Sequence, residues 1–304
     1  MSEGHGAPSW LALVNPVAGG GRCGSTARAA LGALRAQGLD IEERWTEAAG
    51  DARRIAREAA SSGRRHFLTV GGDGTTYEVI NGLFPRPEAA PRPVLGMLPL
   101  GTGNSFLRDF GIRDAQQAAS SLALGATRRV DVIRAEHDGG LLHYLNLLSV
   151  GFTAAAGDLT NRRFKGLGAA GYVAAALLTA ARLETPVFPL RVDGGERDER
   201  PCVLLSFSNS RFTGGAMEIS PESSPTDGAL DVVRVGAMSA LSFLWTFPSV
   251  FRGTHLRHPE ICSRRARRVD LDLAGPVDVM VDGEVERVRL TRLEVVPGAL
   301  EVVA

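Results

Sequence analysis

The stretch that decides the fold is His66-Phe67-Leu68-Thr69-Val70-Gly71-Gly72-Asp73-Gly74-Thr75. A short apolar run that ends in glycines and precedes the helical pattern Tyr77–Phe84 predicts a buried strand, a tight turn and a helix. A carboxylate between glycines at such a junction can reach a metal–phosphate group while the bare backbone approaches the phosphates. A purely structural turn rarely needs this combination, so we expect a phosphate-binding site here.

Two further glycine-rich turns, Asn15–Gly21 and Gly101–Phe106, lie in the same half of the chain, each after a strand-like run. Because ligands on parallel sheets bind at the carboxyl ends of the strands, the three turns together predict one nucleotide site. Asn104 and Arg108 suit this site, since an amide donates to phosphate or sugar oxygens and a guanidinium neutralises phosphate charge. Taken alone, Asn15–Gly21 is equally compatible with a simple turn that needs positive φ.

The first half alternates between strand-like and helix-like patterns, which predicts βαβ units and a mostly parallel sheet. Its motifs do not match the Walker or the dinucleotide-binding pattern. Apolar runs predict strands at Trp10–Val14, Leu39–Trp45, His66–Val70 and Val94–Pro99. Helical patterns follow at Ser25–Gln37, Gly50–Ser62 and Tyr77–Phe84.

From about Asp131 the pattern changes to β-branched runs separated by Gly, Asp and Pro, which predicts a β-rich second domain. We expect domains at residues 1–132 and 133–304 with a cleft between them, and the final strand is left free to return to the first domain. Two helical patches, Ala169–Leu183 and Ser239–Phe251, interrupt the strands. Strands are expected at Val130–Glu136, Leu142–Ser149, Val187–Val192, Cys202–Asn209, Ala229–Val235, Arg268–Leu273, Val277–Val281 and Leu293–Val296.

Composition excludes several classes of protein. The 304 residues carry 34 basic and 34 acidic side chains, so the chain lacks the basic field of a general nucleic-acid binder. Cys23, Cys202 and Cys262 lack the spacing of a disulfide framework or a zinc site, which suits a reducing cytoplasm. The apolar stretch Ala169–Leu183 is shorter than the ~20 residues that span a bilayer, and Met1–Ser9 lacks the features of a signal peptide. We expect a cytoplasmic protein that at most contacts the inner face of a membrane.

These motifs resemble the catalytic domain shared by diacylglycerol kinases, sphingosine kinases and bacterial YegS-like lipid kinases. The resemblance covers essentially the whole chain, in order. In the first half it rests on the motifs N-P-x-x-G-G from Asn15, G-G-D-G-T from Gly71 with Glu78 after it, and P-L-G-T-G-N from Pro99. In the second half it rests on Ser220–Asp231, Val281–Glu284 and Pro297–Leu300.

The resemblance implies an ATP- and Mg²⁺-dependent transfer of phosphate to a lipid hydroxyl. It implies a NAD-kinase/phosphofructokinase-like three-layer α/β domain with a parallel sheet, followed by a β-rich sandwich domain. The resemblance places the following residues around ATP: Asn15, Pro16, Val17, Ala18, Gly19, Thr46, Gly72, Asp73, Gly74, Thr75, Thr76, Tyr77, Glu78 and Thr102. The side-chain chemistry above adds Asn104 and Arg108.

The same resemblance implies the catalytic roles. Glu284 would be the general base that accepts the hydroxyl proton, and Asp73 and Asp131 would join a magnesium–water network. Such roles suit phosphoryl transfer, which depends on positioning and charge neutralisation. A structural magnesium ion is implied at Asp227, with backbone carbonyls near Ser224 and Ala229.

Some of these motifs also have simpler structural interpretations, and one position departs from the family pattern. Asp282-Gly283-Glu284 is also typical of an ordinary hairpin turn, and Asp227-Gly228 is compatible with a simple turn. Ser105 stands where many bacterial members of the family carry Asp, which weakens a magnesium role at this position and the assignment to diacylglycerol in particular. The aromatic segment Ser239–Phe251 is either core or a lipid-facing lip, and the basic cluster Arg264–Arg268 is either a solvated surface or a headgroup contact.

The expected partners are ATP and a membrane lipid of the diacylglycerol or sphingoid type, reached by peripheral membrane contact. No nucleic acid is expected, and a homodimer is left open. One alternative is a soluble-substrate kinase, because NAD kinases also resemble the G-G-D-G-T turn. Another is a lipid-binding or regulatory protein that has lost catalysis, which Ser105 motivates.

Overall fold

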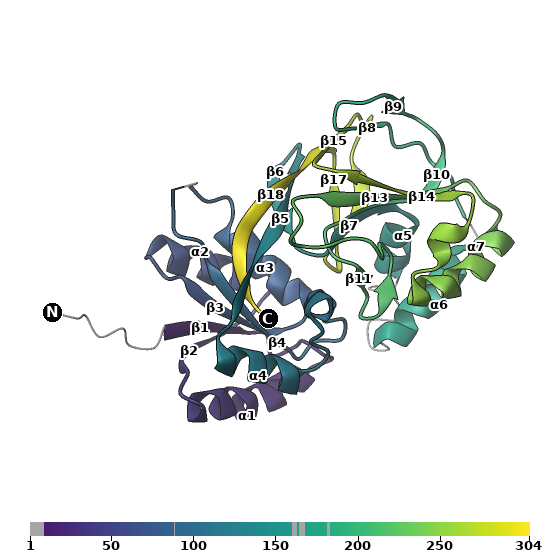
Figure 1. Cartoon of the computed structure of the whole chain (residues 1–304). Coiled ribbons are helices and arrows are strands. Elements are labelled where there is room, and N and C mark those ends of the chain that lie inside the picture. The colour runs from purple at the N-terminus through teal and green to yellow at the C-terminus, as the bar shows by residue number, and fades with distance from the viewer. Residues whose placement is uncertain (1–8, 88, 160–162, 164–167, 181–182) are drawn as a thin grey trace. The chain divides into compact units, whose positions relative to one another are not determined.

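The computed structural model describes residues 9–87, 89–159, 163, 168–180 and 183–304 (Figure 1). The chain divides into two compact units, one of Met1–Val130 with Ala299–Ala304 and the other of Asp131–Gly298. Strands β5 (Thr127–His137) and β18 (Leu290–Val303) each contribute residues to both units. Parts of two segments discussed above, residues 1–8 of Met1–Ser9 and residues 181 and 182 of Ala169–Leu183, lie outside the described residues.

The first unit is built on a parallel sheet with the strand order β2-β1-β3-β4, and the end of β18 pairs with β4 in parallel. Each strand leads into a helical segment, as the alternating pattern predicts. The strands are β1 (Ser9–Val14), β2 (Asp40–Trp45), β3 (His66–Gly71) and β4 (Val94–Pro99). The helices are α1 (Arg22–Ala36), α2 (Asp51–Ser61), α3 (Asp73–Leu83), the 3₁₀ helix η1 (Phe106–Phe110) and α4 (Ala115–Leu124).

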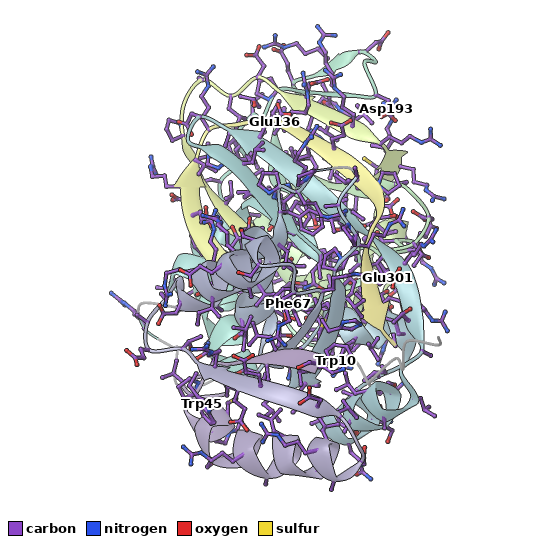
Figure 2. All side chains as sticks on the ribbon, turned by 90° about the vertical axis from the view of Figure 1, so that its left-hand side faces the viewer. Trp10, Trp45, Phe67, Glu136, Asp193 and Glu301 are labelled. Atoms are coloured by element: carbon purple, nitrogen blue, oxygen red, sulfur yellow. The ribbon has the colours of Figure 1, made fainter. Side chains whose placement is uncertain are left out.

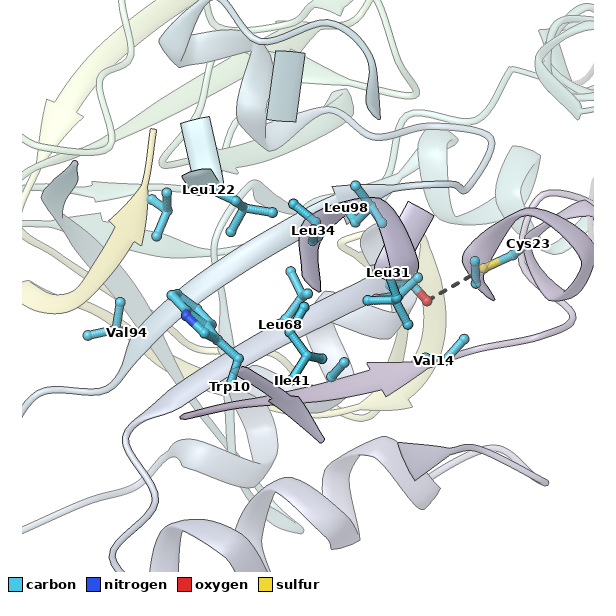
Figure 3. Packing of buried hydrophobic residues seen from close by; sticks show 14 residues of the cluster. Trp10, Val14, Cys23, Leu31, Leu34, Ile41, Leu68, Val94, Leu98 and Leu122 are labelled. Carbon is cyan, nitrogen blue, oxygen red and sulfur yellow. Dashed lines mark hydrogen bonds between the residues drawn. The ribbon is translucent and has the colours of Figure 1, made fainter. Parts of the chain in front are cut away.

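Helix α1 packs one apolar face on this sheet. Its buried residues Cys23, Ala27, Leu31 and Leu34 recur at helical spacing. Figure 3 shows this face against the strands, where the Cys23 thiol donates to the carbonyl oxygen of Val70 (3.6 Å). The strands β1, β3 and β4 are buried along almost their whole length and carry mostly apolar residues, as is typical of strands covered on both faces, whereas the edge strand β2 is largely polar. Figure 2 marks Trp10 and Phe67 on neighbouring strands of this unit.

The second unit contains antiparallel sheets. One has the order β14-β13-β10-β7-β16-β17, and another consists of β11 and β12. In addition, β18, β15, β8 and β9 pair in turn, while β5 pairs with β18 and β6. The strands are β6 (Gly140–Tyr144), β7 (Leu147–Gly151), β8 (Leu190–Val192), β9 (Arg197–Asp198), β10 (Cys202–Ser208), β11 (Phe212–Thr213), β12 (Met217–Glu218), β13 (Leu230–Gly236), β14 (Ile261–Ala266), β15 (Arg268–Leu271), β16 (Val277–Val281) and β17 (Glu284–Val288). The helices are α5 (Phe152–Leu159), α6 (Gly168–Ala180), α7 (Ala240–Thr246), η4 (Phe247–Arg252) and η5 (His255–Arg257).

The predicted fold class, a parallel α/β unit followed by an antiparallel β-rich unit, is confirmed. Several expected elements differ in their bounds, for example β8, which begins at Leu190, and β18, which runs from Leu290 to Val303. Two others differ in kind. The run Leu142–Ser149 forms two strands, β6 and β7, with a turn between them. The patch Ser239–Phe251 begins as α7 and continues as η4, because Pro248 lacks the N–H that a continuing α-helix needs. Within the described residues, no helix is long and apolar enough to cross a membrane.

Candidate functional site

Three backbone loops meet at the carboxyl ends of β1, β3 and β4. A Cβ atom at Gly101 would lie 2.3 Å from the Cα of Gly72, and one at Gly19 would lie 2.6 Å from the carbonyl oxygen of Leu100. Both distances are shorter than those of real Cβ contacts, so these approaches require glycine. The glycine turns that the sequence assigned to one nucleotide site are therefore in direct backbone contact.

Asn15 connects the first loop to helix α3. Its Nδ2 donates to Oγ1 of Thr75 (3.1 Å), and its Oδ1 accepts from the N–H of Val17 (3.2 Å). Val17 itself is 74% exposed at the surface of the loop. Because both ends of the Asn15 amide are used, this side chain holds the loop against the start of α3. Pro16 and Ala18 lie in the first loop, Gly74 lies in the first turn of α3, and all three are half-buried.

Asp73 is the first residue of α3 and contacts the third loop. Its Oδ1 and Oδ2 accept from the N–H of Ser105 (3.0 and 3.3 Å), and Oδ2 also accepts from the Ser105 hydroxyl (3.3 Å). Ser105 is almost fully buried, whereas Asp73 is half-buried. The serine that stands in place of an expected acid thus binds the carboxylate that an acid would repel.

Asn104 shapes the third loop from within. It has a φ of 53°, its Nδ2 donates to the carbonyl oxygens of Gly101 (2.7 Å) and Pro99 (3.4 Å), and its Oδ1 accepts from the N–H of Gly101 (3.2 Å). Asn is one of the few residues that adopt positive φ readily. The side chain of Thr102, in the same loop, is exposed. Thr102 and Asn104 are the two polar side chains of this loop that were expected to contact the nucleotide, and of these only Thr102 is exposed.

Glu78 caps the N-terminus of α2. Its Oε1 accepts from the N–H of Gly50 (2.9 Å) and its Oε2 from the N–H of Ala52 (3.1 Å), groups that have no partner inside a helix. Thr46 lies at the start of the same loop, and its N–H and hydroxyl both donate to the carbonyl oxygen of Val14 (2.9 and 3.3 Å). Glu78 and Thr46 therefore hold the connection between β2 and α2 in place.

Thr76 and Tyr77 point into the first unit. Each is 8% exposed, and Oγ1 of Thr76 is hydrogen-bonded to Oγ1 of Thr69 (3.1 Å). Arg108, by contrast, has a buried Nε for which no hydrogen-bond acceptor is found among the described residues. A small pocket at the loops is lined by Gly72, Asp73 and Asn104.

Asp131 is a buried carboxylate of the second unit. It is 2% exposed, and its Oδ2 and Oδ1 accept from the N–H groups of Gly228 and Gly298 (2.7 Å each). Burial raises the pKa of Asp131, the two N–H bonds oppose this, and the charge of Asp227 raises it further. Asp131 thus ties together two segments that are far apart in sequence, and both of its oxygens are engaged in doing so.

The loop around Asp227 is the place where the sequence predicts a structural metal site. Oδ1 of Asp227 accepts from the N–H of Ala229 (3.1 Å), its other oxygen pairs with Arg265, and the hydroxyl of Ser224 contacts that of Thr226 (3.1 Å). Across the described residues, no three His, Cys, Asp or Glu side chains are placed to hold a metal. A cation here would therefore be held by one carboxylate and backbone carbonyls, a donor set that hard cations accept.

Glu284 lies just after a two-residue turn whose residues, Asp282 and Gly283, have φ values of 45° and 92°. The Asp282 carboxylate accepts from the N–H groups of Leu145, Asn146 and Leu147 (3.0, 3.0 and 3.1 Å). Glu284 is exposed and begins β17. The hairpin that carries Glu284 is thus anchored to the turn between β6 and β7.

An apolar pocket lies within the second unit, where α7 and η4 cover the sheet. Its free volume is about 50 Å³, so a long acyl chain would enter only if side chains moved apart. The sequence indicated only the aromatic part of its lining, because the rest comes from alternate positions of separate strands. Residues that line it include Phe152, Met217, Val233, Phe243, Phe247 and Met280.

Comparison with known families divides the chain into two matches. Residues 9–135 match the diacylglycerol kinase catalytic domain. Residues 146–304 match the YegS C-terminal NAD kinase beta sandwich-like domain. The two matches follow one another along the chain and together span most of it.

Whole-length relatives agree with these matches. A diacylglycerol kinase of Mycobacterium tuberculosis is 31% identical over 294 residues, 96% of this chain and 93% of the relative. A protein of Stenotrophomonas maltophilia named probable lipid kinase YegS-like is 31% identical over 297 residues, 96% of this chain and 94% of the relative. A crystal structure from Bacillus anthracis, provisionally named a diacylglycerol kinase, has 26% identity and a TM-score of 0.80, covering 99% of this chain and 97% of that one.

Proposed function

Because the chain belongs to the family of diacylglycerol kinase-type and YegS-like lipid kinases, we propose that it transfers the γ-phosphate of ATP to the hydroxyl group of a diacylglycerol- or sphingoid-type lipid. The observation that carries this proposal is the contact between the three glycine loops at the carboxyl ends of β1, β3 and β4. Such loops present backbone N–H groups to phosphates, and the start of α3 adds the positive end of a helix dipole.

The residues of the first unit divide into two groups under this proposal. Gly72, Asp73 and Thr102 contact the phosphates or their metal, and Arg108 offers a guanidinium nitrogen that has no acceptor among the described residues. The second group positions the loops and comprises Asn15, Thr46, Thr75, Glu78 and Asn104.

Mg²⁺ bound with ATP would neutralise charge on the transferred phosphoryl group. Asp73 offers a half-buried carboxylate for a water-mediated contact with it, and Asp131 supports that network from its buried position. A second, structural cation would be held by Asp227 and the carbonyls near Ser224 and Ala229. Arg265 already offsets part of the charge of Asp227. As the family resemblance implies, this cation is proposed to stabilise the loop rather than to take part in the reaction.

Glu284 is proposed as the general base that accepts the proton of the lipid hydroxyl. It is exposed, and the anchored Asp282-Gly283 turn limits its movement. The apolar pocket beneath α7 and η4 is proposed to take part of the lipid chain, which requires its aromatic side chains to open.

The test is a labelled-ATP assay with Mg²⁺ against diacylglycerol, a sphingoid base, ceramide and phosphatidylglycerol in mixed micelles, with the products separated. We expect one of these classes to be phosphorylated and expect EDTA to abolish the reaction. NAD⁺ belongs in the same panel, since its phosphorylation in place of any lipid would favour a kinase of the NAD-kinase type. Lipid binding without any transfer would instead favour a protein that has lost catalysis.

A further inference from the structure

The segment formed by α7 and η4 has two unlike faces. Phe243 is 8% exposed and lines the apolar pocket together with Phe247. Leu241 and Trp245 are 67% and 80% exposed. Because they are four residues apart in a helix, these two side chains lie on one side of it, away from the pocket. The segment thus exposes large apolar side chains that its own core does not use.

A third large apolar side chain is partly exposed in the same segment. Phe251, in η4, is 46% exposed and contacts the ring of Phe247, with ring centroids 6.2 Å apart. We call Leu241, Trp245 and Phe251 the α7 surface. Exposed apolar side chains that gather in one segment indicate an interaction site.

The segment that carries the α7 surface, residues 232–259, has charge of one sign, while Glu218 of β12 lies beside Gly253 at the end of η4. The sequence holds no acidic residue between Asp231 and Glu260, whereas Arg252 and Arg257 are exposed. A Trp–Leu–Phe face next to arginines is the composition of segments that insert into the headgroup region of anionic bilayers. A water-soluble partner would not require this lack of acidic groups.

We propose that the α7 surface binds an anionic lipid bilayer, with Trp245 as its anchor at the interface. This inference rests on the proposed function, because a lipid kinase must take its substrate from a bilayer. The opposite face of the same segment lines the apolar pocket. A lipid chain that leaves the bilayer at the α7 surface therefore needs to pass only one helical segment to reach that pocket.

The first experiment needs no kinase activity. Of the three tryptophans, Trp10 is buried, Trp45 is half-buried and Trp245 is 80% exposed. On vesicles of phosphatidylcholine and phosphatidylglycerol in equal parts, we expect the fluorescence of the full chain to shift to shorter wavelengths. Trp245→Phe should lose this shift, and vesicles of phosphatidylcholine alone should produce less of it. An unshifted spectrum on the anionic vesicles would overturn the proposal.

The second experiment uses the double variant Leu241→Ser/Trp245→Ser in a vesicle sedimentation assay. Losing the burial of two large apolar side chains should weaken binding by at least about tenfold. Leu124→Ser is the matched control, because Leu124 is 82% exposed in the first unit. The control should bind like the parent. If the double variant bound vesicles as strongly as the parent, the proposal would be overturned. It would also be overturned if the double variant changed from dimer to monomer while its vesicle binding stayed intact, because the surface would then bind a second copy of the chain.

A third measurement separates this inference from the proposed function. The double variant should keep the parent's rate on a short-chain lipid below its micelle concentration, and lose rate only when the lipid is embedded in anionic vesicles. A parent protein that binds these vesicles but phosphorylates no lipid would refute the proposed function and leave the membrane surface standing. Equal rates of parent and double variant on embedded lipid would refute the membrane surface alone.

Discussion

Asp73 and Ser105 are joined across two loops: the carboxylate of Asp73 accepts both the backbone N–H and the hydroxyl of Ser105. This pair connects the first turn of α3 to the loop after β4. These hydrogen bonds hold the carboxylate in one orientation. A preorganised charge costs no reorganisation when the substrate arrives, which is the condition for electrostatic catalysis.

We expect Asp73→Asn to reduce phosphoryl transfer by about a hundredfold or more, because the negative charge that acts on the metal is lost. The amide oxygen of Asn still accepts from the N–H of Ser105, so the free energy of unfolding should change by less than about 1 kcal/mol. The labelled-ATP assay and thermal unfolding measure the two effects. Ser105→Ala is the control, since it keeps the N–H bonds and should retain most of the rate. Normal turnover of Asp73→Asn would remove Asp73 from the reaction.

Glu284→Gln should lower turnover by about 10²–10⁴-fold, the usual contribution of a general base. Its affinity for ATP, measured by calorimetry, should match that of the parent. Glu286→Gln changes a neighbouring carboxylate of the same strand and should keep the parent rate. Weaker ATP binding together with an unaltered rate would show that Glu284 is not the base.

Asp282→Ala should act on both stability and turnover. It leaves the N–H groups of Leu145, Asn146 and Leu147 without their charged acceptor, which should cost about 3 kcal/mol in urea unfolding. Turnover should fall because the hairpin that carries Glu284 is no longer anchored. Combined with Glu284→Gln, the substitution should cause little further loss of turnover. An additive loss in the double variant would mean that Asp282 does not act through Glu284.

Glu78→Ala should destabilise the protein by about 1–2 kcal/mol, because two N–H groups at the start of α2 lose their acceptor. Glu58→Ala is the matched control on α2, where Glu58 forms only an exposed pair with Arg54 and should change stability by less than about 0.5 kcal/mol. Both are measured by urea unfolding. An unchanged midpoint with lost ATP affinity would assign Glu78 to the nucleotide instead.

Asp198 should make stability depend on pH. The bidentate hydrogen bond from Arg200 lowers the pKa of Asp198 to about 2, below the ~3.9 of an unfolded chain. The ionised form is therefore favoured by folding, and its contribution is complete above about pH 4 and lost as the pH falls towards about 2. Because Arg200 is largely exposed, the contribution should not exceed about 1 kcal/mol. The free energy of unfolding of Asp198→Asn should be lower than that of the parent at pH 7 and equal to it near pH 2. A difference in unfolding free energy that does not depend on pH would contradict this cause.

The nucleotide site could be predicted as a group of loops but not as a set of side-chain roles. Strand, glycine turn and helix are local patterns, and parallel strands necessarily bring their carboxyl ends to one edge. Motif position predicts Glu78 at ATP and side-chain chemistry predicts Asn104 there, whereas in the structure both carry loop hydrogen bonds. Whether they also contact ATP stays a prediction. Their partners depend on packing between helices and within the loop, which spacing along the chain does not encode.

The sequence by itself determined the fold class, the family and the three glycine turns, because alternating strands and helices and the need for glycine are properties of short segments. Only the tertiary structure decided that Leu142–Ser149 breaks into two strands. The reason is Asp282, whose carboxylate binds the backbone N–H groups of the turn across about 135 residues of chain. It also decided which aromatic residues of α7 and η4 enter the pocket and which stay exposed, since burial depends on what the fold places beneath each face.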